Sequence, residues 1–135
     1  MRKMEKLFNS LVAVVATFFT YLFGNWDLAL QVLIIFMVLD YLTGVVYAYT
    51  QKQLNSEVGF KGLIKKCMIL VVLAVGVELD RMLGGDGTWV FRTLVAYFYI
   101  ANEGISLLEN VSNLGVPIPD KIRNALEQLN KDNEE

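Results

Sequence analysis

Apolar residues along the chain gather in four long runs that are separated by short polar segments. The most continuous run extends from Leu28 to Tyr49 and carries one formal charge, Asp40, near its middle. Because about 20 apolar residues in a helix cross a bilayer, this run predicts a membrane span. The run at residues 7–23 is near the lower length limit and contains several polar residues, so an interfacial first helix with three remaining spans is an alternative. The other predicted spans are residues 63–83 and 89–108.

The segments between these runs carry residues that are typical of turns and loops. Tight turns are predicted at residues 24–27 and 84–87, which are rich in glycine and aspartate. In the longer connection at residues 50–66, glycines at positions 59 and 62 are expected to bend the chain. Lys65 and Lys66 are expected to extend toward the lipid headgroups from the start of the third run.

The C-terminal part of the chain has a different pattern. After a Gly-Val-Pro-Ile-Pro break, Asp120 to Lys131 predict a short amphipathic helix with one apolar face, followed by a disordered acidic tail. This helix could lie on the inner leaflet, pair between subunits or cap the bundle, and the sequence does not distinguish these roles. The apolar face consists of Ile122, Ala125, Leu126 and Leu129.

Composition indicates an all-α integral membrane protein. Hydrophobic residues make up 55% of the 135 residues and charged residues 19%, which is more apolar surface than a soluble domain of this size can bury. The net charge of −2 gives no reason to expect nucleic-acid binding. The chain has one cysteine and no histidine, so we expect no metal site, no cofactor and no catalysis through a Cys/His pair. The predicted class is a non-enzymatic membrane helical bundle.

The basic residues predict an orientation in the membrane. They precede the first run and recur in the 50–66 connection and the C-terminal region, whereas the two short turns contain none. Because lysine and arginine favour the cytoplasmic side, both termini are expected to be cytoplasmic in a multi-pass protein of the cytoplasmic membrane. Residues 1–110 would form the transmembrane domain and residues 111–135 a cytoplasmic helix and tail. The first run lacks a convincing cleavage site and is expected to be retained.

The 28–49 run carries a face of small and polar residues, formed by Asp40, Gly44 and Ala48 at intervals of four. A carboxylate at the centre of a bilayer costs about 2.5–3.5 kcal/mol on insertion scales, so Asp40 is expected to face protein or water. Small side chains let helix backbones approach closely, which indicates a helix that associates with other helices. Asp40 also fits an ion or proton site, although no discontinuous span or inverted repeat accompanies it.

Charged residues end the third run, where Glu78 and Arg81 are spaced to pair along a helix and Asp80 lies between them. These residues either mark the headgroup boundary or line a wet interior together with Arg92 of the next run.

Asn102, Glu103 and Gly104 lie toward the cytoplasmic end of the fourth run. Asparagine can hydrogen-bond across helices and glycine permits close packing, so these residues either support helix association or line a pore. Both interpretations predict that they face protein rather than lipid.

Four motifs, in their order and spacing, resemble the toxin-secretion/phage-lysis holin family of Gram-positive bacteria and their phages. They are Asp-Tyr-Leu-Thr-Gly at 40–44, Gly-Phe-Lys-Gly-Leu at 59–63, Tyr-Ile-Ala-Asn-Glu-Gly-Ile-Ser at 99–106 and Gly-Val-Pro-Ile-Pro at 115–119. The resemblance implies a protein that accumulates in the cytoplasmic membrane and assembles at a set time into homo-oligomeric lesions. Such lesions release an endolysin to the cell wall or export a toxin, and the family has no catalytic residues.

Two other classes of function are open on the residues alone. One is a small ion channel or transporter that uses Asp40 and Glu78, and the other is a membrane adaptor that recruits a cytoplasmic partner through its C-terminal helix. Met4 adds a separate hypothesis, because initiation there would remove Arg2 and Lys3, as in dual-start holins whose longer product delays the shorter one. An ordinary basic flank with a chance methionine is the simpler interpretation.

Overall fold

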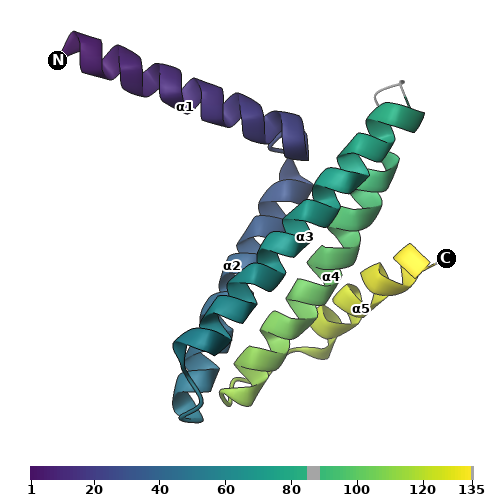
Figure 1. The fold of residues 1–135 in the computed structure, drawn as a ribbon. Helices are drawn as coiled ribbons and strands as arrows, with labels where there is room; N and C mark the ends of the chain where they lie inside the picture. The colour runs from purple at the N-terminus through teal and green to yellow at the C-terminus, as the bar shows by residue number, and fades with distance from the viewer. Residues whose placement is uncertain (85–88, 135) are drawn as a thin grey trace.

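A computed structural model gives the fold, and it describes residues 1–84 and 89–134, with side chains up to residue 131. The secondary structure of these residues is entirely helical, which confirms the predicted all-α class. The helices are α1 (Arg2–Phe23), α2 (Leu28–Thr50), α3 (Ser56–Leu83), α4 (Val90–Asn113) and α5 (Asp120–Glu134), as Figure 1 shows.

Helices α2, α3 and α4 form the body of the molecule. They run alongside one another, and consecutive helices point in opposite directions (Figure 1). α1 leaves one end of this bundle and points away from it, whereas α5 turns back along α4 (Figure 1). The bundle therefore has a turn end, which holds the α1–α2 turn and the start of α4, and a loop end, which holds the α2–α3 and α4–α5 connections.

Side-chain caps explain where two of the helices begin. The carboxylate of Asp27 accepts a hydrogen bond from the backbone N–H of Leu30 at 3.0 Å. The amide oxygen of Asn55 accepts one from the N–H of Val58 at 2.8 Å. Such caps satisfy N–H groups that the first helical turn leaves without partners. Asn55 therefore starts α3 at Ser56, seven residues before the predicted span at 63.

The prediction that Gly59 and Gly62 bend the connection after α2 is wrong, because both lie inside α3. They face Tyr41 of α2, and a Cβ added at Gly59 would lie 3.3 Å from the Tyr41 hydroxyl oxygen. At Gly62 it would lie 3.4 Å from the ring. The two glycines thus make room for a side chain of the neighbouring helix, which is the other common use of glycine in helices.

One other predicted boundary is present in the structure, and two are shifted toward the C-terminus. The turn at residues 24–27 is present, and Gly24 ends α1 with φ 81°. α4 continues five residues beyond the predicted end at 108. The acidic tail predicted as disordered is helical through Glu134, because α5 continues that far. The predicted turn at 84–87 falls mostly outside the described residues.

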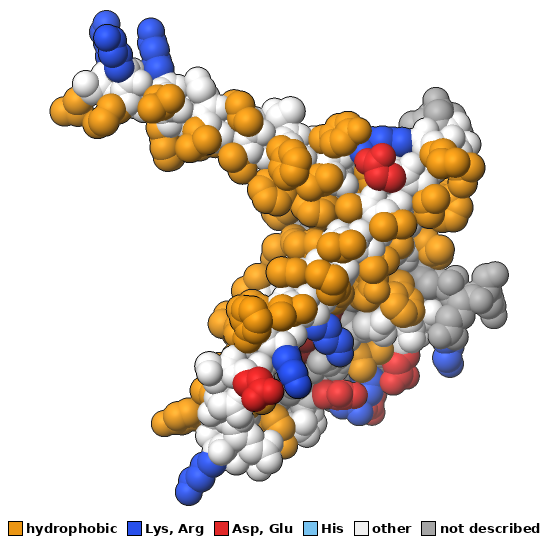
Figure 2. All heavy atoms as spheres, in the orientation of Figure 1, with side chains coloured by type: hydrophobic (Ala, Val, Ile, Leu, Met, Phe, Trp, Pro, Cys, Tyr) orange, Lys and Arg blue, Asp and Glu red, His pale blue; other side chains and the backbone are white. Residues whose placement is uncertain are grey.

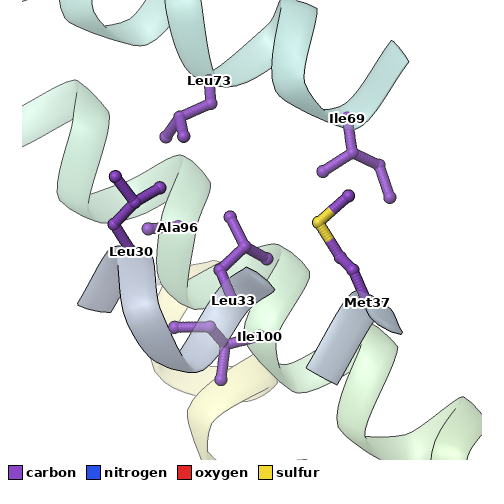
Figure 3. Close-up of a cluster of buried hydrophobic side chains, with 7 residues drawn as sticks. All are labelled: Leu30, Leu33, Met37, Ile69, Leu73, Ala96 and Ile100. Atoms are coloured by element: carbon purple, nitrogen blue, oxygen red, sulfur yellow. The ribbon is translucent and has the colours of Figure 1, made fainter. Parts of the chain in front are cut away.

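The bundle core is apolar and draws on α2, α3 and α4 (Figure 3). Leu33 and Leu73 are 0% exposed, so the space between the helices is filled at this level. Gly76 brings α3 close to α4, since an added Cβ would lie 3.1 Å from the carbonyl oxygen of Phe91. The core side chains are Leu30, Leu33, Met37, Ile69, Leu73, Ala96 and Ile100.

Large apolar side chains cover much of the outside of the molecule (Figure 2). Within the described chain, α1 has no buried residue, and Leu7 is 73% exposed. α1 and α2 are long and apolar enough to cross a membrane, whereas charged residues keep α3 and α4 from meeting the same criterion. A surface with so much exposed apolar area is typical of contact with lipid or with other protein.

Candidate functional site

A buried group of charged side chains, here called the polar centre, joins the three bundle helices. It consists of Asp40 of α2, Lys66 of α3 and Glu103 of α4. The Lys66 ammonium donates to Oδ2 of Asp40 at 2.8 Å and to Oε2 of Glu103 at 2.5 Å. The side chains of Asp40, Lys66 and Glu103 are 11%, 15% and 10% exposed. Removal of Lys66 from this group would leave two carboxyl groups without a cation.

Neutral polar side chains complete the surroundings of Asp40. The Asn110 amide donates to Oδ1 of Asp40 at 2.9 Å and to the Thr43 hydroxyl at 3.1 Å. Ser106, one turn earlier on α4, lines the same hollows as Asp40. Gly44 leaves space for the Asn110 contact, since an added Cβ would lie 3.5 Å from the Asn110 amide nitrogen. Asp40 and Gly44, one turn apart on α2, therefore both contact Asn110 of α4 in the same chain.

Two hollows open beside the polar centre. One, of about 280 Å³, extends from Asp40 to Leu54 and Gly59 at the loop end of the bundle. The other, of about 420 Å³, is lined by Glu103, Asn102 and Tyr99 of α4. Water can therefore approach the charged groups from the loop end. The side chains that line both hollows are Asp40, Lys65, Lys66 and Ser106.

A second cluster holds the turn end of the molecule together. Arg92 of α4, only 3% exposed, donates to both carboxylate oxygens of Asp27, at 2.7 and 3.2 Å. Its guanidinium also donates to the carbonyl oxygens of Phe23 at 2.6 Å and Asn25 at 2.9 Å. The Arg92 hydrogen bonds are the main reason that the pKa of the Asp27 carboxyl lies below its usual range. Arg92 thus fixes the α1–α2 turn to α4.

Asp80 and Arg81 of α3 extend this cluster. The two carboxylate oxygens of Asp80 accept hydrogen bonds from the backbone N–H groups of Phe91 and Arg92, each at 2.8 Å, so Asp80 caps α4 from the neighbouring helix. Arg81 pairs with Glu78, as their spacing predicts. Arg81 also donates to the Tyr21 carbonyl, and its guanidinium carbon lies 4.1 Å from the centre of the Tyr21 ring. This is the main polar attachment of α1 to α3 among the described residues.

Most of the predicted site residues lie in the polar centre or in the turn-end cluster, or beside one of them. Asp40, Gly44 and Glu103 meet at the polar centre, while Ala48 and Asn102 line the two hollows. At the turn end, Arg92 does not pair with the side chains of Glu78 or Arg81; it pairs with Asp27 and reaches Asp80 only through its backbone N–H. Glu78, Asp80, Arg81 and Arg92 all lie at the turn end.

Gly104 lies against α5 rather than on a free face. An added Cβ would lie 2.9 Å from a methyl carbon of Leu126 and 3.0 Å from the Phe36 ring. Leu126 and Leu129 are the partly buried members of the predicted apolar face of α5, whereas Ile122 is 50% exposed. Of the roles that the sequence left open for α5, the structure shows contact with the bundle of its own chain.

Three residues of the two clusters were missed by sequence reasoning: Asp27, Lys66 and Asn110. The expectation that Lys66 extends toward the headgroups is wrong, because α3 begins ten residues earlier and Lys66 lies well inside it, beside Asp40. The sequence did contain a signal that α3 begins before residue 63. Asn55 is a typical N-cap residue, and no proline follows it in the first helical turn. No comparable local signal marks Asn110, whose role depends on the packing of α4 against α2.

Comparison with known proteins covers nearly the whole described chain. Residues 17–131 match the sequence profile of the bacteriophage holin family. A probable holin of Bacillus phage phi105 is 34% identical over 115 residues, which cover 85% of this chain and 83% of that protein. An uncharacterised 14.9 kDa protein in the nagH 3′ region of Clostridium perfringens is 54% identical over 130 residues, covering 94% and 98% of the two chains. No solved structure is significantly similar.

Proposed function

We propose, because this chain belongs to the bacteriophage holin family, that it assembles into homo-oligomeric lesions in the cytoplasmic membrane. The lesions open at a set time and let an endolysin, or in a bacterial setting a toxin, cross the membrane. The observation that carries the proposal is the family match over residues 17–131, which spans all of α2, α3 and α4 and both polar clusters. Family membership also makes the chain a non-enzymatic membrane protein.

The packing of the bundle supports assembly from several copies. Leu33 and Leu73 fill the space between the helices, so one chain leaves no passage for a protein through its centre. The exposed apolar surface of α1 and of the outer faces of α2 and α3 is available to lipid or to other copies. Because lipid tails are as apolar as leucine, association of copies would depend on packing and polar contacts. A lesion wide enough for an enzyme then requires many chains around its rim.

The proposed topology places the loop end of the bundle on the cytoplasmic side. That end carries Lys52 of the α2–α3 connection, Lys61 in the first turns of α3 and basic residues at the start of α5, which favour the cytoplasm. For its basic N-terminus to return to the same side, α1, which points away from the bundle in Figure 1, has to turn alongside the bundle and cross the membrane. Residues 1–110 are the membrane domain in this topology, with spans near 7–23, 28–49, 63–83 and 89–108, and residues 111–135 are cytoplasmic.

Co-expression with an endolysin that lacks its own export signal tests the proposal. We expect abrupt loss of membrane potential and viability after a delay, followed by lysis, and no lysis when either gene is omitted. Release of a cytoplasmic reporter enzyme measures the size of the opening. Selective ion flux without release of the reporter would instead support a small channel, and membrane-inserted protein that causes neither effect would contradict the proposal.

We propose a separate test of Met4 as a second start, for which an ordinary basic flank with a chance methionine is the simpler interpretation. The longer product would carry the additional charges of Arg2 and Lys3, which favour the cytoplasmic side for the N-terminus. Met4→Leu should remove a shorter product and change the lysis time. One product, with unchanged timing, would show that Met4 is an ordinary residue of α1.

A further inference from the structure

The charges of the polar centre do not balance. Asp40 and Glu103 each contribute a carboxylate, whereas Lys66 contributes the ammonium that contacts both of them. Because both carboxylates contact the same ammonium nitrogen, the two carboxyl groups lie next to each other. If all three groups were ionised, the centre would carry one net negative charge between three helices.

The neighbouring groups on each helix do not supply the missing positive charge. The other polar side chains around the centre are neutral; they are Tyr41 of α2 and Tyr99, Asn102, Ser106 and Asn110 of α4. Lys65 of α3 lines both hollows, but it is exposed, and no ion pair joins it to the centre in the described part of the chain. From α5, the apolar Leu126 lies against Gly104, and no ion pair joins a described charged residue of α5 to the centre.

Physical chemistry disfavours the fully ionised state of such a group. Two neighbouring carboxylates repel each other, and their low exposure to solvent strengthens that repulsion. A net charge within the thickness of a bilayer adds a further cost. Glu103 lies five residues before the proposed end of its span at 108, so at 1.5 Å per residue it is roughly 8 Å inside the cytoplasmic boundary of the bilayer. One bound proton removes both the repulsion and the net charge.

We propose that the polar centre is a proton-binding site in which Asp40 and Glu103 share one exchangeable proton beside Lys66. The proton is bonded to an oxygen of one carboxyl, while the other carboxylate is balanced by the Lys66 ammonium that contacts both groups. It comes from water and returns to water through the hollow that opens at the loop end, past Leu54 and Gly59. The site does not require lesion formation, so it stands independently of the proposed function.

Infrared spectroscopy of the full chain in lipid nanodiscs tests the site. A protonated carboxyl group has a C=O stretching band that a carboxylate lacks. We expect this band in the wild-type protein at neutral pH, shifted in D₂O because the proton exchanges. Asp40→Asn and Glu103→Gln should each abolish the band, since either variant leaves one carboxylate and one ammonium, which balance without a proton.

Glu109→Gln is the matched control, because Glu109 is an exposed carboxylate on the same helix. This variant should keep the full band. Absence of the band from the wild-type protein would overturn the proposal, and so would its persistence in both Asp40→Asn and Glu103→Gln. The wild-type spectrum decides the question even where a variant fails to fold. Since it is recorded on purified protein, failure of the endolysin assay would leave this result unchanged.

Discussion

Arg92 of α4 binds Asp27 of the α1–α2 turn through both carboxylate oxygens, at 2.7 and 3.2 Å. The two residues are 65 positions apart, and their contact fixes the start of α2 against the start of α4. The partners differ in exposure, because the Arg92 side chain is 3% exposed and that of Asp27 is 46% exposed. The pair therefore lies at the edge of the packed bundle. Solvent reaches the Asp27 carboxylate there, so its protonation can change with pH.

Asp27→Asn should make the turn end less sensitive to acid. The Arg92 hydrogen bonds lower the pKa of Asp27 in the folded protein. A carboxyl whose pKa is lowered by folding stabilises the fold above its unfolded value of about 3.9, and this contribution is lost as the pH falls through the folded pKa. The wild-type protein should thus exceed Asp27→Asn in thermal stability at pH 7.

The same advantage should disappear as the pH falls through the lowered pKa of the folded Asp27 carboxyl, because the wild-type side chain is then neutral too. The measurement is thermal unfolding in detergent at a series of pH values. Asp120→Asn is the control, because Asp120 is an exposed residue at the start of α5, and its curve should run parallel to that of the wild-type protein. A constant difference between wild type and Asp27→Asn across the whole pH range would contradict the prediction.

Gly24→Ala should detach the α1–α2 turn from α4. Gly24 has φ 81° and ψ −169°, a region that is essentially restricted to glycine, and an added Cβ would lie 2.6 Å from Nε of Arg92. Backbone strain of this kind costs about 1–3 kcal/mol, and displacement of the guanidinium adds to it. The expected results are a lower melting temperature in detergent and faster proteolysis between α1 and α2.

Gly115→Ala separates the two causes. Gly115 also has a positive φ, 95°, but an added Cβ would meet no atom within 4 Å. It therefore carries the backbone cost without the clash, and it should destabilise the protein less than Gly24→Ala. Equal losses in the two variants would show that the contact with Arg92 is unimportant.

The apolar pattern predicted the second helix well and the third helix poorly, for a physical reason. The predicted span at 28–49 ends within one residue of α2, because its apolar run and its helix coincide. α3 begins at Ser56, and its first turns carry the charged residues Glu57 and Lys61. Because these turns are polar, the apolar pattern predicted a loop there. A helix that begins in a polar environment is determined by its cap, Asn55, rather than by apolar content.

The candidate site was predictable in part from one residue. The cost of a carboxylate in lipid predicts that Asp40 needs a polar partner. It does not identify that partner, because Lys66 and Asn110 lie 26 and 70 positions away, and their contact with Asp40 depends on how three helices pack. For the same reason Gly44 and Gly104, predicted as contacts between copies, lie against Asn110 and Leu126 of the same chain.

Gly44→Leu and Asp40→Leu should delay or abolish lysis while leaving membrane insertion intact. A leucine at 44 would collide with Asn110, because even a Cβ there lies 3.5 Å from its amide nitrogen. A leucine at 40 removes the acceptor that Lys66 and Asn110 share. Either change should shift α2 relative to α4 and so alter the shape of the chain that assembles. Lysis time at matched expression is the measurement.

Leu42→Val is the control for these variants, since Leu42 lies on α2 near both residues but is 53% exposed. It should lyse cells at the wild-type time. Wild-type timing in Gly44→Leu and Asp40→Leu, with the same amount of protein in the membrane, would show that the α2–α4 contact has no part in lesion formation.

Lys66→Met should be the most destabilising single change in the bundle, because it leaves Asp40 and Glu103 facing each other without a cation. Breaking a buried ion pair by removal of one partner costs about 3 kcal/mol or more. Lys65→Met, at the exposed neighbouring position, should change stability by less than about 0.5 kcal/mol. Adding Asp40→Asn and Glu103→Gln to Lys66→Met should recover more than half of the loss, since the amides keep hydrogen bonds without charge. The free energy of unfolding of each variant is measured by denaturant titration in detergent. If the triple variant is no more stable than Lys66→Met, the unpaired carboxylates do not cause the loss of stability.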